Sequence, residues 1–198
     1  MKWLSIPFER LSFRRLIKVK PLRIIVGASG GSQKGWVSSE IYILDLLKPN
    51  GWKRYFANNS IDAILAEHVW EHLTKEGGAI AAKTCFQYLK HGGYLRVAVP
   101  DGLHPDPKYI EYVTPKPYGP SGRYLDHKAL YVYKSFKEIF ESAGFKVELL
   151  EYFDEFGKFH YKEWDPDRGI VFRTKRFDSR NKNSNLNTTS ILLDAFKM

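Results

Sequence analysis

Short runs of apolar residues, rich in β-branched side chains or alternating with polar ones, recur along this chain. They lie at residues 22–27, 36–40, 61–67, 94–100, 146–153, 169–177 and 190–197. Short runs that are apolar throughout are typical of parallel strands buried on both faces, whereas alternation indicates a strand with one more exposed face. The pattern therefore predicts a sheet of several short strands.

Between two of these runs, apolar residues recur at helical spacing. The helix that they predict joins the strands at 61–67 and 94–100, and one of its sides should pack on the sheet. The residues on that side are Ala79, Ala82, Phe86 and Leu89. We expect Gly92-Gly93 to end this helix. Two parallel strands joined by a helix form a right-handed βαβ unit.

Three further helical segments are predicted. Residues 134–143 form a helix that Gly144 should end. Residues 8–18 form a short basic helix that ends before Pro21. A helical turn is expected within residues 45–56.

Polar and ionisable residues follow both strands of the βαβ unit. After the first strand come Glu67, His68, Glu71 and His72, and after the second come Pro100, Asp101 and His104. The carboxyl ends of parallel strands lie at one edge of a sheet, and ligands bind beyond that edge. We therefore expect the functional site there.

The length of 198 residues suits one α/β domain. We expect this domain at 21–198, with insertions at about 101–130 and 155–188, behind a basic helical extension at 1–20. The single cysteine, Cys85, excludes an intramolecular disulfide and favours a reducing, cytoplasmic setting. No apolar run reaches the length of a membrane span, and the first residues lack the apolar core of a signal peptide.

The formal net charge is +9, and the basic residues concentrate at residues 2–23 and 173–182. Such segments favour weak contact with phosphate, an anionic glycan or a membrane surface. A solvated basic helix and a solvated basic hairpin explain the same pattern. Both interpretations stay open at the level of the sequence.

A cluster of small residues, Gly27-Ala28-Ser29-Gly30-Gly31, follows the first strand directly. Small residues let a ligand approach the backbone, and glycine permits positive φ. Glu40 follows the next short strand, where an acid can accept hydrogen bonds from a ribose diol. A tight turn and an exposed acid are the alternatives.

In order along the chain, VGASGG, GWVSSE, NNSIDAILAEHVWEHL, LKHGGYLRVAVPD and SFKEIFESAGFKVELLEY resemble the class I S-adenosylmethionine-dependent methyltransferases. The likeness is greatest to small bacterial proteins of the type-11 group and covers residues 22–153, while SILLDAFK resembles the final antiparallel strand of that fold. The resemblance implies an α/β fold with a Rossmann-like, mostly parallel sheet whose last strand is antiparallel.

This sequence departs from the family pattern in two places. Glu40 follows Gly27 by only thirteen positions, so the helix after the first strand is missing or one turn long. No third strand is recognisable between Ile41 and Asn59. We expect a sheet that is reduced around the first helix and the third strand. An NAD-binding site would need G-x-G-x-x-G at the start of a true helix, and neither is present.

The resemblance also implies a cofactor, S-adenosyl-L-methionine, and a set of residues that contact it. These are Gly27, Ala28, Ser29, Gly30, Glu40, Asp45, Asn59, Ser60, Ile61, Glu67 and His68. Glu40 would hold the ribose, Asp45 and the segment 59–61 would lie near adenine, and Glu67-His68 would pass under the methionine. Glu71 and His72 would cap and orient the following helix instead.

Methyl transfer from a sulfonium is an in-line displacement, and a hydroxyl acceptor also benefits from a general base. Our candidates are His104 and His127, which bracket the long connection after the strand at 94–100. They could equally order that loop. His68 and His72 have the i, i+4 spacing of a metal-binding helix, but Val69 replaces the catalytic Glu, so we expect no metal site.

The aromatic residues of the insertion after residue 151 offer flat surfaces that suit sugar rings or bases. We expect a small-molecule or glycan-precursor acceptor. Two alternatives remain: a non-catalytic module that binds an anionic polymer, and an RNA methyltransferase. The Asn-Pro-Pro-aromatic motif of enzymes that methylate amino groups of nucleic acids is absent after the strand at 61–67.

Overall fold

The structure of the chain is a computed structural model that describes residues 6–116, 127–181 and 185–198. Parts of the predicted extension and of both predicted insertions lie outside these residues. The helices are α1 (Ile6–Leu16), α2 (Pro49–Trp52), α3 (Lys75–Tyr88), α4 (Pro107–Val113) and α5 (Tyr133–Ser142), with short 3₁₀ helices η2 (Trp70–His72) and η3 (Pro166–Arg168). The strands are β1 (Arg23–Val26), β2 (Val37–Ser39), β3 (Ile61–Glu67), β4 (Leu89–Pro100), β5 (Lys146–Phe153), β6 (Phe159–Tyr161) and β7 (Ser190–Phe196).

All seven strands form one sheet, in the order β2-β1-β3-β4-β7-β5-β6. Strands β1 to β4 are parallel, with Ile24 beside both Val37 and Ile64. Strand β7 enters antiparallel between β4 and β5, and β6 adds an antiparallel edge to β5. The predicted mostly parallel sheet with an antiparallel last strand is confirmed.

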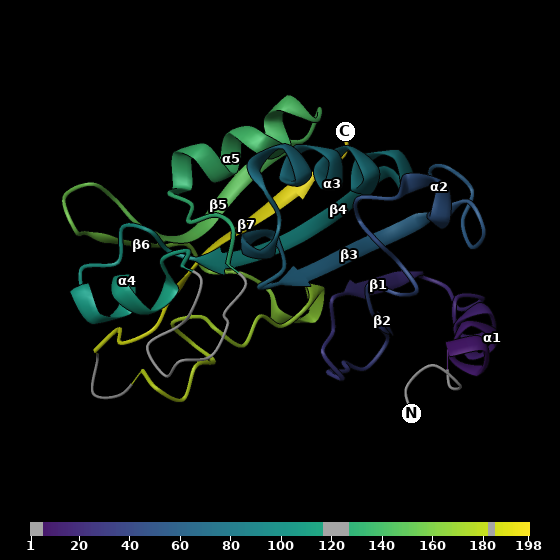
Figure 1. Cartoon of the computed structure of the whole chain (residues 1–198), viewed down its shortest axis with the longest axis horizontal. Coiled ribbons are helices and arrows are strands. Elements are labelled where there is room, and N and C mark those ends of the chain that lie inside the picture. The colour runs from purple at the N-terminus through teal and green to yellow at the C-terminus, as the bar shows by residue number, and fades with distance from the viewer. Residues whose placement is uncertain (1–5, 117–126, 182–184) are drawn as a thin grey trace.

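The two faces of the sheet are covered differently. Helices α3 and α5 lie over one face, and their buried side chains Ala82, Tyr88, Phe136 and Phe140 belong to the larger core (Figure 1). The opposite face is covered by the cover segment, residues 162–181, which contains no helix longer than η3. Trp164 and Val171 of this segment join a smaller core on that face, with strand residues Ile25, Leu65, Ala98, Leu150 and Leu192.

The sheet is reduced where the sequence predicted it. The chain passes from β1 to β2 through turns, and between β2 and β3 it forms only α2, with no strand. Helix α1 packs on this part of the domain, because Phe13 is buried against Tyr55 and Phe56 at ring-centroid distances of 5.2 and 6.1 Å. None of the helices in the described ranges is both long and apolar enough to cross a lipid bilayer.

Two predictions about elements were wrong. Helix α3 ends at Tyr88, and Gly92-Gly93 lies within β4, because β4 begins directly at Leu89. Segment 169–177 is not a strand. Strand β7 already has a neighbouring strand on each side. The backbone N–H groups of Phe172 and Arg173 donate to the Glu67 carboxylate and not to the backbone of a neighbouring strand.

The side of α3 that faces the core is also shifted from the predicted one. Ala81, Ala82, Cys85 and Tyr88 are buried, whereas Ala79 and Phe86 of the predicted side are only partly buried. The buried, unbridged Cys85 thiol is a packing residue, and burial raises its pKa. The strands at 22–27, 36–40, 61–67, 146–153 and 190–197 and the helix at 134–143 are confirmed within one or two residues at each end.

Candidate functional site

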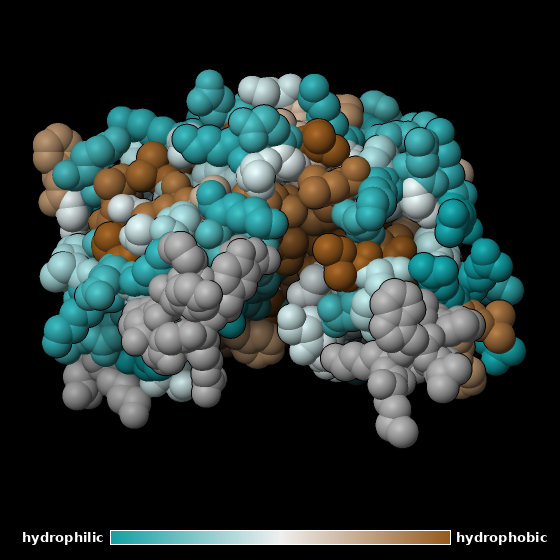
Figure 2. Space-filling view, viewed as in Figure 1, coloured by the Kyte–Doolittle hydropathy of each residue, from teal (hydrophilic) through white to brown (hydrophobic). Residues whose placement is uncertain are grey.

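A cavity of about 650 Å³ opens at the carboxyl ends of β1, β3 and β4. Figure 2 shows the surface hollowed there, with hydrophobic side chains visible inside the hollow. The walls come from the loop after β1, the turn after β3, helix α4, His127 and the cover segment. The predicted edge of the sheet therefore carries a cavity of ligand size.

The glycine loop, residues 27–31, forms one wall. Gly27 has φ +63°, and a Cβ there would lie 2.7 Å from Val69 Cγ2, so a side chain at this position is strained and crowded. Gly27, Ala28 and Ser29 line the cavity. Gly30 does not line it, and its N–H donates to Glu40 Oε1 at 3.0 Å. The loop therefore presents backbone to the cavity and holds Glu40 at its outer side.

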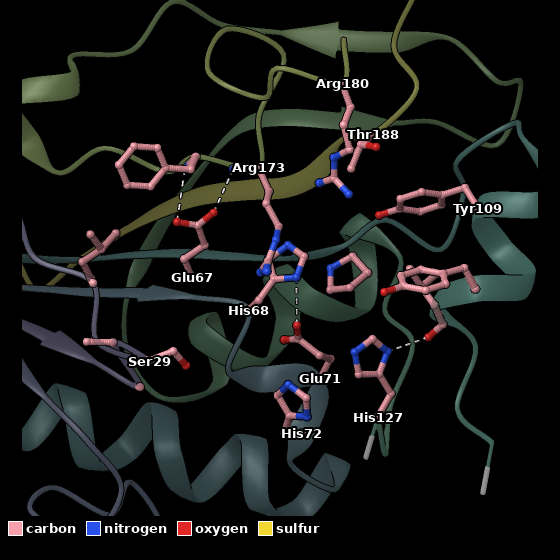
Figure 3. A pocket seen from close by; sticks show the side chains of 18 of the residues that line it. Ser29, Glu67, His68, Glu71, His72, Tyr109, His127, Arg173, Arg180 and Thr188 are labelled. Carbon is pink, nitrogen blue, oxygen red and sulfur yellow. Dashed lines mark hydrogen bonds and ion pairs between the residues drawn. The ribbon is translucent and has the colours of Figure 1, made fainter. Parts of the chain in front are cut away.

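Glu67 and His68 form the turn after β3. Both line the cavity (Figure 3). The Glu67 carboxylate accepts hydrogen bonds from the N–H groups of Phe172 at 3.1 Å and Arg173 at 2.8 Å. His68 has φ +54°, and its Nε2 lies 2.9 Å from Ser190 Oγ. Glu67 thus attaches the cover segment to the sheet edge, and His68 links β3 to β7.

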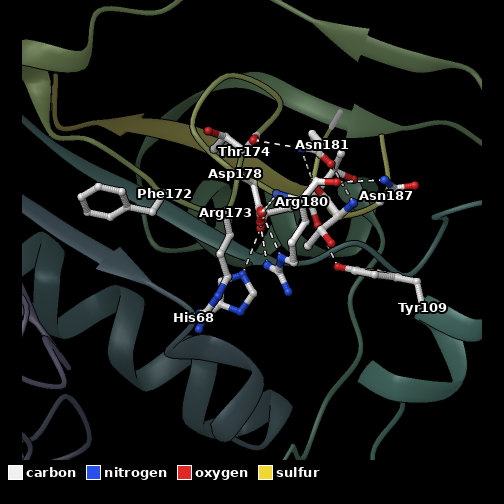
Figure 4. Close-up of polar contacts among 12 residues, drawn as sticks. His68, Tyr109, Phe172, Arg173, Thr174, Asp178, Arg180, Asn181 and Asn187 are labelled. Carbon is white, nitrogen blue, oxygen red and sulfur yellow. Dashed lines mark hydrogen bonds and ion pairs between the residues drawn. The ribbon is translucent and has the colours of Figure 1, made fainter. Parts of the chain in front are cut away.

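Hydrogen bonds within the cover segment and to Thr188 hold it in place (Figure 4). Arg180 makes two bonds to the Asp178 carboxylate, at 2.9 and 2.6 Å. The Asn181 side-chain amide donates to the carbonyl oxygens of Thr174 and Thr188. Arg180 and Arg173 line the cavity, as does Lys108 of α4. Basic side chains therefore reach the cavity from the cover segment and from α4.

A second cluster of ionisable groups also lines the cavity. Glu71, His72 and His127 have side-chain ligand atoms within 4.8 Å of one another. Glu71 is only 1% exposed, and His127 Nδ1 donates to the Val113 carbonyl at 2.8 Å. The sequence did not predict this cluster, because His127 is far from the other two residues along the chain. Glu71 does not cap α3: the Thr74 hydroxyl does, by accepting from Gly77 N–H.

The structure treats the two predicted catalytic histidines differently. His127 lines the cavity. His104 does not: it is 5% exposed, its Nε2 donates to the Leu186 carbonyl at 3.0 Å, and its Nδ1 accepts from Asp106 N–H at 3.1 Å. Burial lowers the pKa of His104. Because both ring nitrogens are engaged, the geometry gives His104 a loop-ordering role and offers no proton transfer at the cavity.

Six predicted cofactor contacts do not line the cavity: Gly30 and Glu40, which are bonded to each other at its outer side, and Asp45, Asn59, Ser60 and Ile61. Asn59, Ser60 and Ile61 precede or begin β3, so they lie at the amino edge of the sheet, opposite the cavity. There the Lys197 ammonium donates to Asn59 Oδ1 at 2.6 Å. The Asp45 carboxylate is used locally, by Leu47 N–H and by Lys48 at 3.0 Å. Their predicted adenine contacts therefore have no geometric support.

Asp101, directly after β4, is buried and does not line the cavity. Its carboxylate is fully buried and accepts from Leu103 N–H at 2.9 Å and Phe153 N–H at 2.7 Å. Burial raises the pKa of Asp101 to about 6, although these two hydrogen bonds act in the opposite direction. Asp101 therefore joins the end of β4 to the end of β5.

The sequence matches no protein-family model and no curated protein. Solved structures do match in shape. An S-adenosylmethionine-dependent methyltransferase from Thermotoga maritima, described as a possible histamine N-methyltransferase, is 15% identical, with 99% of this chain and 92% of that chain covered and a TM-score of 0.51. A complex of the Haloferax volcanii Trm112 methyltransferase activator with a proposed methyltransferase gives 9% identity, coverage of 94% and 87%, and a TM-score of 0.51.

At these identities the matches establish the fold alone. They agree with the seven-stranded, mostly parallel sheet, in which the antiparallel strand β7 lies between β4 and β5. The chain has the class I S-adenosylmethionine-dependent methyltransferase fold, in a form reduced around the first helix and the third strand.

Proposed function

We propose that this protein is an S-adenosylmethionine-dependent methyltransferase that binds its cofactor in the cavity at the carboxyl edge. The observation that carries the proposal is the position of the cavity, between the loop after β1 and the turn after β3. In open α/β sheets, ligands bind outside the carboxyl ends of the strands. A volume of about 650 Å³ is within the range of small-ligand sites.

The glycine loop would hold the cofactor mainly through its backbone. Gly27, Ala28 and Ser29 present small groups to the cavity, so the methionine and ribose parts can approach closely. Glu40 Oε1 accepts from Gly30 N–H, and Oε2 would accept from a ribose hydroxyl. Glu67 and His68 would form the floor, with their side chains held by the cover segment and by β7.

The acceptor would enter beside His127, where the cavity is also lined by α4 and the cover segment. In-line transfer needs the acceptor atom and the sulfonium held in line with water excluded. The Nδ1–H of His127 donates to Val113, so in the neutral ring the lone pair is on Nε2, the atom that could accept a proton. A base so placed contributes roughly 10²–10⁴-fold. Lys108 and Arg173 favour a small acceptor that carries negative charge.

Equilibrium dialysis with labelled S-adenosylmethionine tests the proposal. We expect the wild-type chain to bind, and Glu40→Gln to bind at least about tenfold more weakly, because a hydrogen bond to a charged group contributes roughly 1.5–3 kcal/mol. Glu138→Gln, on the exposed side of α5, is the matched control and should bind like the wild type. Absence of binding by the wild type would overturn the enzyme proposal, and equal binding by Glu40→Gln would overturn the ribose contact.

The rival hypotheses from the sequence predict different behaviour in the same assay. A non-catalytic module would bind an anionic polymer but no cofactor. An RNA methyltransferase would bind cofactor and also RNA, with an affinity that falls steeply as salt is added. A small-molecule methyltransferase should bind cofactor and show no such RNA affinity.

A further inference from the structure

The geometry points to a binding site for one divalent transition-metal ion, with Glu71, His72 and His127 as its ligands. Two imidazoles and one carboxylate form a ligand set that suits zinc and its first-row neighbours. All three residues line the cavity, so an ion there would keep positions open toward a bound molecule (Figure 3).

The Glu71 carboxylate carries the first part of the argument. It is 1% exposed, and neither of its oxygens accepts a hydrogen bond from a residue that the structure describes. Oε1 lies 3.1 Å from His68 Nδ1, but the two groups are not aligned as a hydrogen bond. A buried carboxylate without hydrogen bonds is costly, and a bound cation removes that cost.

The orientation of His127 is the second part. Its Nδ1–H donates to the Val113 carbonyl at 2.8 Å, which fixes the tautomer and leaves the Nε2 lone pair for a ligand bond. Histidines that bind metals almost always donate their other ring N–H to a carbonyl or carboxylate in this way.

The backbone fixes the three ligands relative to one another. Glu71 and His72 are consecutive residues of η2. The segment that bears His127 is attached to that turn, because Lys128 N–H and Ala129 N–H both donate to the Glu71 carbonyl, at 2.7 and 3.2 Å. Ligand atoms around one tetrahedral ion lie roughly 3–3.5 Å apart. The present separations, within 4.8 Å, therefore need only small side-chain rotations.

What the ion would do there rests on the proposed function. Bound beside the acceptor, it would polarise an acceptor hydroxyl and lower its pKa, so that the proton is lost more easily before methyl transfer. His127 would then be a ligand of the ion, and its Nε2 would no longer be available as a base. The site itself does not depend on this role, because metal binding can be measured without cofactor.

Titration of the metal-free protein with Co²⁺, followed by visible absorption, and with Zn²⁺, followed by calorimetry, tests the inference. We expect one equivalent to bind per chain. Glu71→Gln and His127→Gln should each weaken binding by more than about 100-fold, since loss of a second-shell partner alone costs roughly 10–100-fold. His91→Gln is the matched control, because His91 is exposed at the start of β4, at the amino edge of the sheet.

Circular dichroism of each variant checks that it folds, and Glu71→Gln changes no side-chain volume. Failure of the wild type to bind one equivalent, or equal binding by the wild type and both cavity variants, would overturn the metal site. Cofactor dialysis on the same variants separates the two proposals: a chain that binds S-adenosylmethionine but no metal retains the proposed function and loses this inference.

Discussion

Several ionisable side chains around the cavity are buried, and their protonation is linked to the stability of the fold. Asp101 is the clearest case, since its carboxylate is fully buried and burial raises its pKa to about 6 from an ordinary value of 3.8. A raised carboxyl pKa means that the folded state holds the proton more tightly than the unfolded state. The contribution to stability is therefore complete below the unfolded pKa and is lost as the pH rises through the folded pKa.

We predict that this one residue makes the wild-type chain less stable by up to roughly 3 kcal/mol as the pH rises from about 4 to about 7. Asp101→Asn removes the titrating group and keeps one oxygen for Leu103 or Phe153. In urea unfolding, the free energy of unfolding of the wild type should therefore fall relative to that of the variant as the pH rises toward 7. A difference that does not change between these pH values would contradict the prediction.

At the same scale, the sequence identified site residues where strand ends were recognisable. Gly27, Ala28, Ser29, Glu67 and His68 all reach the cavity, because each follows an apolar run. Residues 59–61, predicted to lie near adenine, are at the amino edge of the sheet, because a chain without the third strand carries no marker for the loop that would follow it. His104 and His127 could not be told apart, because their burial depends on contacts with residues far along the chain.

At the scale of elements, the pair Arg96–Asp194 joins three parts of the molecule. Both side chains are at most 3% exposed, and the guanidinium makes two bonds to the carboxylate, at 2.8 and 2.9 Å. Its Nη1 also donates to the carbonyls of Asp165 and Gly169 in the cover segment. Strands β4 and β7 are thus connected to the segment that replaces a helical layer.

We predict that Arg96→Met destabilises the chain by about 3–5 kcal/mol, since it leaves the Asp194 carboxylate buried and without its partner. Urea unfolding at neutral pH measures the change. Lys162→Met breaks an exposed pair with Glu148 and serves as the control, with an expected effect of at most about 1 kcal/mol. Equal effects of the two substitutions would show that Arg96 does not hold the cover segment.

The ends of helices and strands were less predictable than their existence. Gly92-Gly93 is a frequent helix end, but β4 begins at Leu89 and continues through both glycines to Pro100. Segment 169–177 has strand-like alternation, yet its N–H groups bind Glu67 and it lies on the face of the sheet. Local pattern cannot decide whether a segment joins a sheet or covers it, because that depends on which edges are already paired.

At the scale of the whole molecule, the family resemblance predicted the mostly parallel sheet with an antiparallel last strand, and the polar residues after two strands predicted the edge at which the cavity lies. The uneven covering did not follow from the sequence. One face carries α3 and α5, while the other relies on the cover segment and its cluster around Trp164 and Val171. That segment therefore has two roles: it covers the face of the sheet that carries no long helix, and it forms one wall of the cavity.

The central claim is that this cavity binds S-adenosylmethionine. A crystal structure of the protein grown with saturating S-adenosylhomocysteine tests it most directly. The account predicts ligand density over Gly27–Ser29, with the ribose at Glu40 and the sulfur near His68. Well-defined density in another place, or an empty cavity in crystals that leave it open to solvent, would contradict the account.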